Sequence, residues 1–307
     1  MSALKPIIVV GSINTDLVVT TKKMPLAGET LIATGFQTHP GGKGANQAVG
    51  IARLGYPVRL IGRLGTDAFG TELRSYLQHA GVDIAGVATS NGSSGVAVIT
   101  VAESGENSIL VAPGSNAEVT PEDLDVNIKV LRSAGMVLVQ LEIPLETVEH
   151  LARICARENV PLVLDPAPAA ELPSSIFKDI AWFTPNQTET AFYLGKKSDH
   201  ASPAETARQL LSKGCQGVVL KMGAEGSYVC SRSGVDDQIP AFAVKAIDTT
   251  AAGDAFNAGF ATGLMLGKSP LDSTAFATAV AAISVTRSGA QPSMPSMSEV
   301  EKFVKSR

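Results

Sequence analysis

The segment DTTAAGDAF, at positions 248–256, has the residue types of a phosphate-binding helix start. Ala251, Ala252 and Gly253 carry almost no side chain, so their backbone N–H groups can approach an anion, and the positive end of an opening helix points the same way. Asp254 follows directly, where a substrate hydroxyl would meet a phosphoryl group, and we predict that it acts as the general base. A lone Gly-Asp pair can also merely cap a helix, so the rest of the chain must decide between the two interpretations.

A second cluster, GGKGANQ at positions 41–47, places a lysine and an amide in a glycine-rich turn. The segment has neither the GxxxxGK[ST] nor the GxGxxG spacing of nucleotide-binding loops. Gly41 and Gly42 let the backbone come close to a ligand, while Lys43 and Asn46 offer hydrogen-bond donors to hydroxyl oxygens. The cluster suits a sugar, and the alternative interpretation is a glycine-rich turn with a solvated lysine.

Two further polar groups follow apolar runs that we predict to be strands. GSINTD, at positions 11–16, ends the first predicted strand with Asn14 and Asp16, which lie on the same side if the chain is extended there. Glu142 follows the run MVLVQL. Strand ends that face a crevice are where α/β sheets bind ligands, although Asn and Asp are also ordinary turn residues and Glu142 could be an exposed loop acid.

Alternating strand and helix patterns must position these groups. From about residue 130 onward the runs MVLVQ (136–140), PLVLD (161–165), AWFTP (181–185) and GVVLK (217–221) alternate with helical patterns, one of which starts near Leu145. This predicts an α/β fold with a mostly parallel sheet. Lys268-Ser269-Pro270 separates the helix after Asp254 from an alanine-rich helix over 273–286, and a short helix is predicted over 297–307.

Two regions do not follow this alternation of strands and helices. Residues 16–38, with DLVVT and TLIATGFQT, and residues 95–112, with GVAVITVA and SILVA, have the pattern of hairpins of half-buried strands. A small sheet without covering helices must have one face covered by substrate, by a partner subunit or by both. We therefore predict a lid formed by about 14–40 and 95–113, inserted in a single domain that spans 1–307. The alternative is that these strands extend the main sheet.

The composition excludes several classes of protein. The chain has 307 residues and a formal net charge of −4 without a basic run, which argues against nucleic acid as a partner. No apolar stretch reaches the length of about 18 residues at which a membrane helix is predicted. The three cysteines are widely spaced and form no CxxC pair, so neither a disulfide framework nor a zinc site is indicated. We expect a cytoplasmic protein with a small-molecule substrate and no membrane association.

The motifs together resemble those of the PfkB family of carbohydrate kinases. The segments GSINTD, GGKGANQAV, GRLGTDAFG (62–70), QLE, DPAPA (165–169), TPNQTE (184–189) and DTTAAGDAFNAGF match family motifs in the family's order, nearly from end to end. The resemblance implies a ribokinase-like fold, a central sheet flanked by helices with a β-sheet lid that also forms a homodimer contact. It also implies transfer of the γ-phosphoryl group of ATP to the 5-hydroxyl of D-ribose, with Asp254 as base and the 251–254 turn as anion hole. In such a reaction positioning and charge neutralisation do most of the work.

The resemblance also assigns binding residues. The sugar would be held by Asn14, Asp16, Gly42, Lys43, Asn46, Glu142 and Asp254. The nucleotide would lie along Asn186, Glu189, Lys221, Gly223, Gly226, Gly253 and Thr278. Asn186 and Glu189 match an NxxE pattern that organises Mg²⁺ and phosphate through water. This chain has Thr278 where the family usually has Asn or His, and Lys221 where several relatives have Thr.

A monovalent cation, K⁺ by resemblance, would bind beside the anion hole. Its site would use Asp248, Thr250, Ser284, Arg287, Gly289 and Ser293, several of them through backbone carbonyls. Two alternatives remain: a kinase of the same family for another small sugar (deoxyribose, a ketohexose or a nucleoside), and a catalytically silent sugar-binding regulator. An amide at position 14 argues against pure deoxyribose use, because it would lose a hydroxyl partner.

Overall fold

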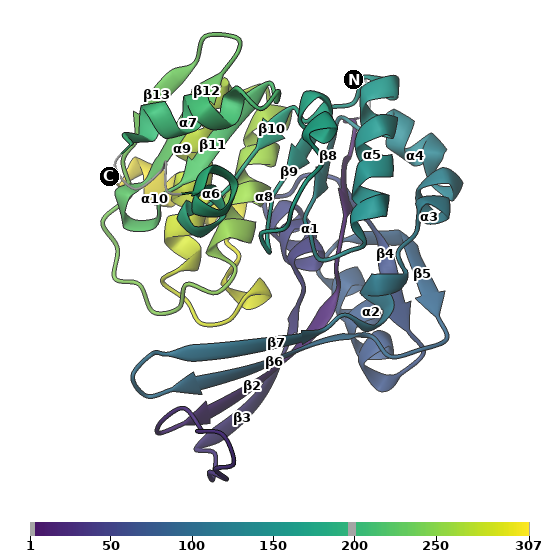
Figure 1. The fold of residues 1–307 in the computed structure, drawn as a ribbon, viewed down its shortest axis with the longest axis vertical. Coiled ribbons are helices and arrows are strands. Elements are labelled where there is room, and N and C mark those ends of the chain that lie inside the picture. The colour runs from purple at the N-terminus through teal and green to yellow at the C-terminus, as the bar shows by residue number, and fades with distance from the viewer. Residues whose placement is uncertain (1–3, 196–200, 307) are drawn as a thin grey trace.

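The structure is a computed structural model that describes residues 4–195 and 201–306. Its main element is a nine-stranded sheet with the order β13-β12-β11-β10-β9-β8-β1-β4-β5 (Figure 1). Seven neighbouring strands are parallel, and β12 and β13 add an antiparallel edge. The strands are β1 (Ile7–Val10), β4 (Val58–Gly65), β5 (Asp83–Ser90), β8 (Met136–Val139), β9 (Leu162–Leu164), β10 (Trp182–Phe183), β11 (Gly217–Lys221), β12 (Ser227–Ser231) and β13 (Asp236–Ile239).

Helices cover both faces of this sheet, as parallel strands require. One face packs against α1 (Lys43–Arg53), α2 (Ala68–His79), α8 (Ala252–Met265), α9 (Pro270–Ser284) and α10 (Met297–Lys305). The other packs against α3 (Pro121–Val126), α4 (Ile128–Ser133), α5 (Leu145–Glu158), α6 (Gln187–Leu194) and α7 (Pro203–Leu211). Short 3-10 turns complete the chain: η1 (Gly114–Glu118), η2 (Ser174–Asp179), η4 (Gly223–Glu225) and η5 (Gln291–Ser293).

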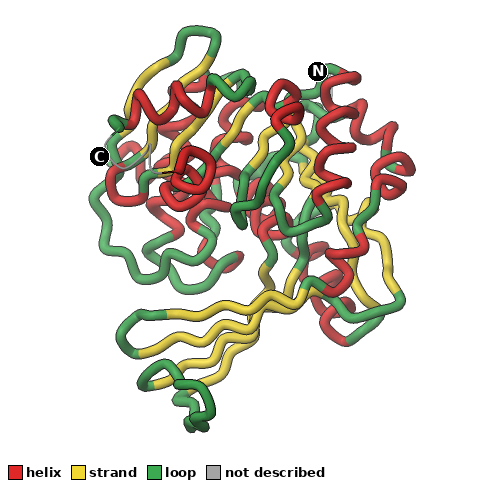
Figure 2. Tube along the Cα trace, viewed as in Figure 1, coloured by secondary structure: helices red, strands yellow, loops and turns green. Residues whose placement is uncertain are grey.

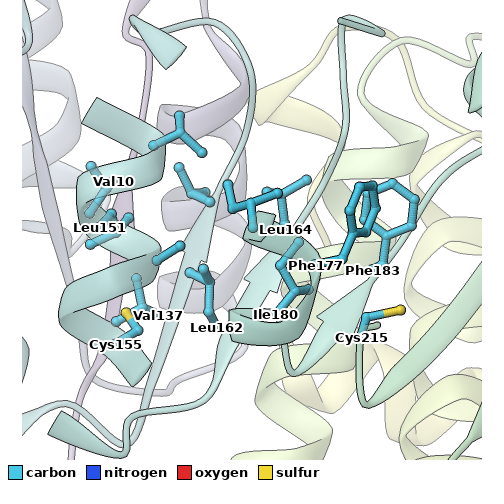
Figure 3. Packing of buried hydrophobic residues seen from close by; sticks show 14 of the residues in the cluster. Val10, Val137, Leu151, Cys155, Leu162, Leu164, Phe177, Ile180, Phe183 and Cys215 are labelled. Carbon is cyan, nitrogen blue, oxygen red and sulfur yellow. The ribbon is translucent and has the colours of Figure 1, made fainter. Parts of the chain in front are cut away.

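Successive residues of the central strands contribute to different halves of the core. Ile8 and Val10 of β1 face the layer that contains α5, whereas Ile7 and Val9 face α1 and α8. Figure 3 shows part of the first layer, with Val10, Val137 and Leu151 at one end and Phe183 at the other. Because both faces are buried, these strands are continuously apolar, which is the pattern that predicted a parallel sheet.

The two predicted hairpins form a separate four-stranded sheet with the order β3-β2-β6-β7. Its strands are β2 (Asn14–Thr21), β3 (Gly35–Gly41), β6 (Gly95–Ala102) and β7 (Asn107–Ala112). Figures 1 and 2 show this sheet extending away from the main body as an arm. The predicted small sheet is confirmed, and the alternative that these strands extend the main sheet is wrong.

Three local details differ from the sequence predictions. Residues 30–34 are not in a strand, because β3 pairs with β2 only from Gly35 onward and Ile32 is 90% exposed. Asn14 does not end the first strand: β1 ends at Val10 and Asn14 begins β2. The last helix ends at Lys305, and Arg307 lies outside the described residues. The predicted break before α9 is confirmed, since Ser269 caps that helix by accepting a hydrogen bond from the N–H of Asp272.

Candidate active site

The carboxyl ends of the parallel strands bring polar side chains from distant segments to one edge of the sheet. Gln140 and Glu142 follow β8, Asp165 follows β9, and Lys221 ends β11. The N-termini of α1 and α8 lie at the same edge, because side chains of both helices bond to each other there. The structure therefore assembles at one place the predicted base and the predicted sugar-binding residues.

The turn before α8 has the geometry of an anion-binding helix start. Ala251 has a left-handed backbone (φ 58°, ψ 15°), which is rare for a residue with a Cβ atom and marks local strain. The helix begins at Ala252, and residues 251–253 are partly exposed. A Cβ atom on Gly253 would meet no neighbour nearer than the Lys221 Nζ, at 3.4 Å. A lysine ammonium thus lies beside the N–H groups that the sequence predicted to hold phosphate.

Asp254 lies buried in the first turn of α8, and two amides fix its carboxylate. Asn46 Nδ2 donates to Oδ2 at 2.9 Å, and Gln47 Nε2 donates to Oδ1 at 3.1 Å. Burial raises the pKa of Asp254 to about 6, while the nearby Lys43 ammonium and the two amides oppose the rise. The group is therefore mostly ionised at neutral pH and has an increased affinity for a proton, as a general base requires.

Gln47 connects this carboxylate to a second buried acid. Its Nε2 also donates to Asp165 Oδ2 at 3.0 Å, and its Oε1 accepts a hydrogen bond from Gln140 Nε2 at 2.6 Å. Asp165 is in turn paired with Lys221 Nζ at 2.7 Å, and the two side chains are 3% and 10% exposed. The network holds a lysine ammonium and a buried acid beside the turn that begins α8.

The amino end of the small sheet supplies the other side of the site. Gly42 has a φ of 86°, and a Cβ atom there would lie 2.6 Å from the backbone nitrogen of Asn14, so this position requires glycine. At Gly41 a Cβ atom would lie 2.2 Å from Asp16 Oδ2. The glycines therefore allow the start of α1 to lie directly against the two polar residues of β2.

Three acids and one lysine share this region. Burial, together with the charges of Glu142 and Asp254, raises the pKa of Asp16 to about 7. Burial would lower the pKa of Lys43, but the charges of Asp254 and Glu142 outweigh it and raise that pKa. Glu142 is fixed by the Ser12 hydroxyl and by the backbone N–H of Lys43, both of which donate to Oε2. A polyol would find both donors and acceptors here.

A cavity of about 750 Å³ adjoins this cluster on the side of α8 and α9. The predicted residues Asn186, Lys221, Gly223, Gly226, Gly253 and Thr278 line it, together with apolar residues such as Phe242, Val244 and Val285. Thr278 uses its hydroxyl within the protein, since it bonds Ser227 Oγ at 3.0 Å and donates to the Thr274 carbonyl at 2.8 Å. Position 278 therefore offers the cavity little more than a methyl group.

Asn186 and Glu189 bond to each other across the start of α6. The side chain of each accepts a hydrogen bond from the backbone N–H of the other, at 2.9 and 2.7 Å. Burial raises the pKa of Glu189, and the nearby Lys221 opposes the rise. Among the described residues no group of three or more His, Cys, Asp or Glu side chains is close enough to hold a metal ion. Any metal must therefore use water or phosphate oxygens as further ligands.

The predicted cation loop is built around Asp248. Its carboxylate accepts hydrogen bonds from the backbone N–H groups of Thr250 at 2.9 Å and Gly289 at 2.8 Å, which brings the segments 248–250 and 284–289 together. Burial would raise the pKa of Asp248, but these hydrogen bonds lower it. The Ser284 carbonyl accepts from the Arg287 N–H at 3.0 Å, and the Ser293 hydroxyl donates to the Ala290 carbonyl. Arg287 turns its side chain to Glu299, so it could offer a cation only its carbonyl.

Sequence reasoning did not assign roles to four buried residues that complete the site: Gln47, Asn116, Gln140 and Asp165. Three of them lie inside quoted motifs, GGKGANQAV, QLE and DPAPA. Their contacts depend on partners about a hundred or more positions away, such as Gln47 with Asp165 and Asp254. Only the order of strands in the sheet brings these residues together.

An acid at a helix N-terminus, between a cluster of polar donors and acceptors and a cavity of about 750 Å³, is the arrangement expected of a phosphotransferase that acts on an alcohol group. Comparison with known proteins agrees. The sequence model described as pfkB family carbohydrate kinase matches residues 5–297. The chain belongs to this family.

Individual relatives match over almost their whole length. A ribokinase of Schizosaccharomyces pombe is 40% identical over 306 residues, covering 96% of each chain. A deoxyribokinase of Salmonella typhi is 36% identical and covers 97% of this chain and 98% of its own. Among solved structures, Arabidopsis thaliana ribokinase complexed with ribose and ATP superposes with a TM-score of 0.92 at 34% identity, covering 99% of both chains. The predicted ribokinase-like fold is confirmed.

Proposed function

We propose that the protein transfers the γ-phosphoryl group of ATP to the 5-hydroxyl of D-ribose. The observation that carries the proposal is the position of Asp254, which bonds the Asn46 amide of the sugar cluster and directly follows Gly253, a residue that lines the nucleotide cavity. A hydroxyl bound beside Asp254 would face a phosphoryl group held at the start of α8. The ribokinases at 40% and 34% identity support ribose as acceptor and ATP as donor.

In this mechanism each side chain has one task. Asp254 accepts the proton of the 5-hydroxyl as the oxygen bonds to phosphorus, and ADP leaves with the electron pair of the broken P–O bond. The N–H groups of 251–254 stabilise the charge on the transferring group, and the Lys221 ammonium beside Gly253 adds to it. Because the transition state is loose, alignment of the two substrates contributes more than the strength of the base.

Two cations complete the proposal. Asn186 and Glu189, with Asp165 nearby, would hold Mg²⁺ through water, because oxygen groups and water are the ligands that this ion prefers. Bound with the nucleotide, the ion would neutralise phosphate charge. K⁺ would bind beside Asp248 and the carbonyls of Thr250, Ser284, Arg287 and Gly289, near Ser293, and would fix the backbone that leads into the anion hole.

The sugar would be held by Asn14, Asp16, Gly42, Lys43, Asn46, Glu142 and Asp254. Deoxyribose is the second candidate acceptor, because a deoxyribokinase is 36% identical to this chain. Each polar group that bonds a hydroxyl of ribose is left unpaired by an analogue without that hydroxyl, and this penalty favours ribose. Asn14 is the residue on which we base this preference.

We also propose that the small sheet is a lid over the sugar and that its outer face pairs with a second copy of the chain. The side chains of Phe36, Val98 and Leu110 lie on the face of this sheet opposite to Asp16 and are between 41% and 72% exposed. Exposed apolar side chains that gather on one face of a sheet favour a partner surface. No described helix is long and apolar enough to span a membrane. We place the protein in the cytoplasm on the basis of its proposed substrates.

The test is release of ADP by the purified protein with Mg-ATP and ribose, deoxyribose, fructose, adenosine or no sugar, with and without K⁺. We expect strong preference for ribose and activation by K⁺. Preference for another sugar would refute the proposed acceptor and retain the kinase. Release of ADP that does not depend on any sugar would refute both the proposed acceptor and the sugar kinase activity.

A further inference from the structure

Asn116 is a buried amide at the root of the small sheet, and the mechanism above gives it no task. It lies in η1, directly after β7, and is 1% exposed. Its Oδ1 accepts the backbone N–H of Ile13 at 2.9 Å, and its Nδ2 donates to the Ile13 carbonyl at 3.2 Å. The same Nδ2 donates to Asn14 Oδ1 at 2.6 Å. Asn116 therefore bonds the chain where β2 leaves the main body.

These contacts decide which way the Asn14 amide points. A backbone N–H can only donate, so the Asn116 atom that faces Ile13 N must be its oxygen, and its other end must be the NH₂ group. That NH₂ group needs an acceptor, so Asn14 must turn its oxygen toward Asn116. Asn14 as a whole is 3% exposed. Its Nδ2 has no hydrogen-bond partner in the described part of the chain. Asn14 thus has an unused donor.

The surrounding backbone keeps space for this pair. A Cβ atom on Gly95, the first residue of β6, would lie 2.1 Å from Asn116 Nδ2 and 2.2 Å from Asn14 Oδ1. Any other residue at this position would occupy the place of the hydrogen bond. Three segments, β2, β6 and η1, therefore meet in one arrangement at the root of the small sheet.

We propose that Asn116 is a positioning residue that makes Asn14 present an N–H donor, and not a carbonyl, to a sugar hydroxyl. Asp16 is two residues along β2 and on the same side of the strand, and it can only accept hydrogen bonds when it is ionised, above its pKa of about 7. A hydroxyl between them accepts from Asn14 and donates its single proton to Asp16. If Asn14 were reversed, that proton would face two acceptors and one would remain unpaired. The proposal rests on the proposed sugar kinase function.

The test is Asn116→Asp, which keeps the shape of the side chain and its bond to the Ile13 N–H but cannot donate to Asn14 or to the Ile13 carbonyl. Asn14 should then turn its NH₂ group toward the introduced carboxylate and its oxygen toward the sugar. We expect KM for ribose to rise about tenfold or more, with kcat changed much less, because a hydroxyl loses its donor and meets a second acceptor. Asn127→Asp is the control: its Nδ2 also donates within the chain, to the Asp123 carbonyl at 2.8 Å, but away from the site.

A double-mutant cycle separates positioning from general damage. In an Asn14→Ala background, Asn116→Asp should change KM by less than about twofold, since the side chain on which it acts is gone. An unchanged KM in the single variant, or an equal rise in both backgrounds, would overturn the proposal. Thermal unfolding checks that each variant is folded, and Asn116→Ala replaces Asn116→Asp in both backgrounds if the latter does not fold. If the wild type prefers another sugar, ribose is refuted as substrate and the same cycle with that sugar still tests Asn116.

Discussion

Replacing Asp254 with asparagine should lower activity. It should also give the variant a stability that, relative to wild type, depends on pH. The wild-type carboxylate has its pKa raised from 3.8 to about 6, chiefly by burial. The folded state therefore binds a proton at Asp254 more tightly than the unfolded state does. Ionisation of Asp254 therefore lowers the free energy of unfolding. The effect is absent below about pH 4 and reaches its full size above about pH 6.

The magnitude follows from the two pKa values. A shift of about two units corresponds to about 3 kcal/mol at neutral pH, of which about 1 kcal/mol is already present at pH 4.5. Asparagine does not titrate. The free energy of unfolding of the Asp254→Asn variant relative to wild type should therefore rise by about 2 kcal/mol between pH 4.5 and pH 7.5. Asn46 and Gln47 both donate to Asp254, so one of them loses its acceptor in the variant, but that loss is the same at both pH values.

Denaturant unfolding of both proteins at the two pH values measures this difference, and turnover with saturating ribose and Mg-ATP measures the loss of the base. We expect turnover to fall by about 10² or more. Asp237→Asn, which replaces an exposed acid on β13, is the control and should leave turnover unchanged. A stability difference that does not vary with pH would refute the assigned titration, and turnover within about tenfold of wild type would refute the assigned base.

Three further variants test other parts of the site. Gly42→Ala forces a Cβ atom against the backbone nitrogen of Asn14 and should raise KM for the sugar about tenfold or more in a folded protein, as measured by steady-state kinetics and circular dichroism. Lys221→Met leaves Asp165 as an unpaired buried acid, so it should lower both stability and turnover; adding Asp165→Asn should restore the unfolding midpoint but not the turnover. Asp248→Ala should remove activation by K⁺, which a comparison of rates in K⁺ and in tetramethylammonium would detect, whereas an undiminished response would contradict the cation loop.

The elements that carry these residues could be predicted because their signals are local. The small residues before Asp254, the hairpin alternation in residues 95–112 and the Ser269-Pro270 start of α9 each depend on neighbours in the sequence, and the structure has a helix start, two strands and a helix there. Residues 30–34 show the limit of this reasoning. Leu31 and Ile32 have the composition of a strand, but no partner strand reaches them, and Ile32 is 90% exposed.

The hydrogen-bond network of the site could not be predicted. Its bonds join segments that become neighbours only through the order of strands in the sheet, and no single segment of the sequence determines that order. Gln47 and Asp165 are 118 positions apart, and Asn14 and Asn116 are 102 apart. Nothing in the neighbouring residues predicts the hydrogen-bond partner of a glutamine after GGKGAN or of an asparagine after a proline-glycine turn. In contrast, Asp254 follows a run of small residues and Lys43 lies in a glycine-rich turn, so the neighbouring sequence was enough to select both.

The charges of the site explain why a cation belongs to the proposed reaction. Asp16, Glu142, Asp165, Glu189 and Asp254 are five acids whose charges act on one another across the site, and Lys43 and Lys221 oppose them. Burial is the main cause of the raised pKa values of Asp16, Glu189 and Asp254, and the neighbouring acids add to it. A nucleotide triphosphate would add further negative charge beside Asp165 and Glu189. Two lysines cannot balance that charge, so the arrangement favours entry of the nucleotide as a complex with a divalent cation.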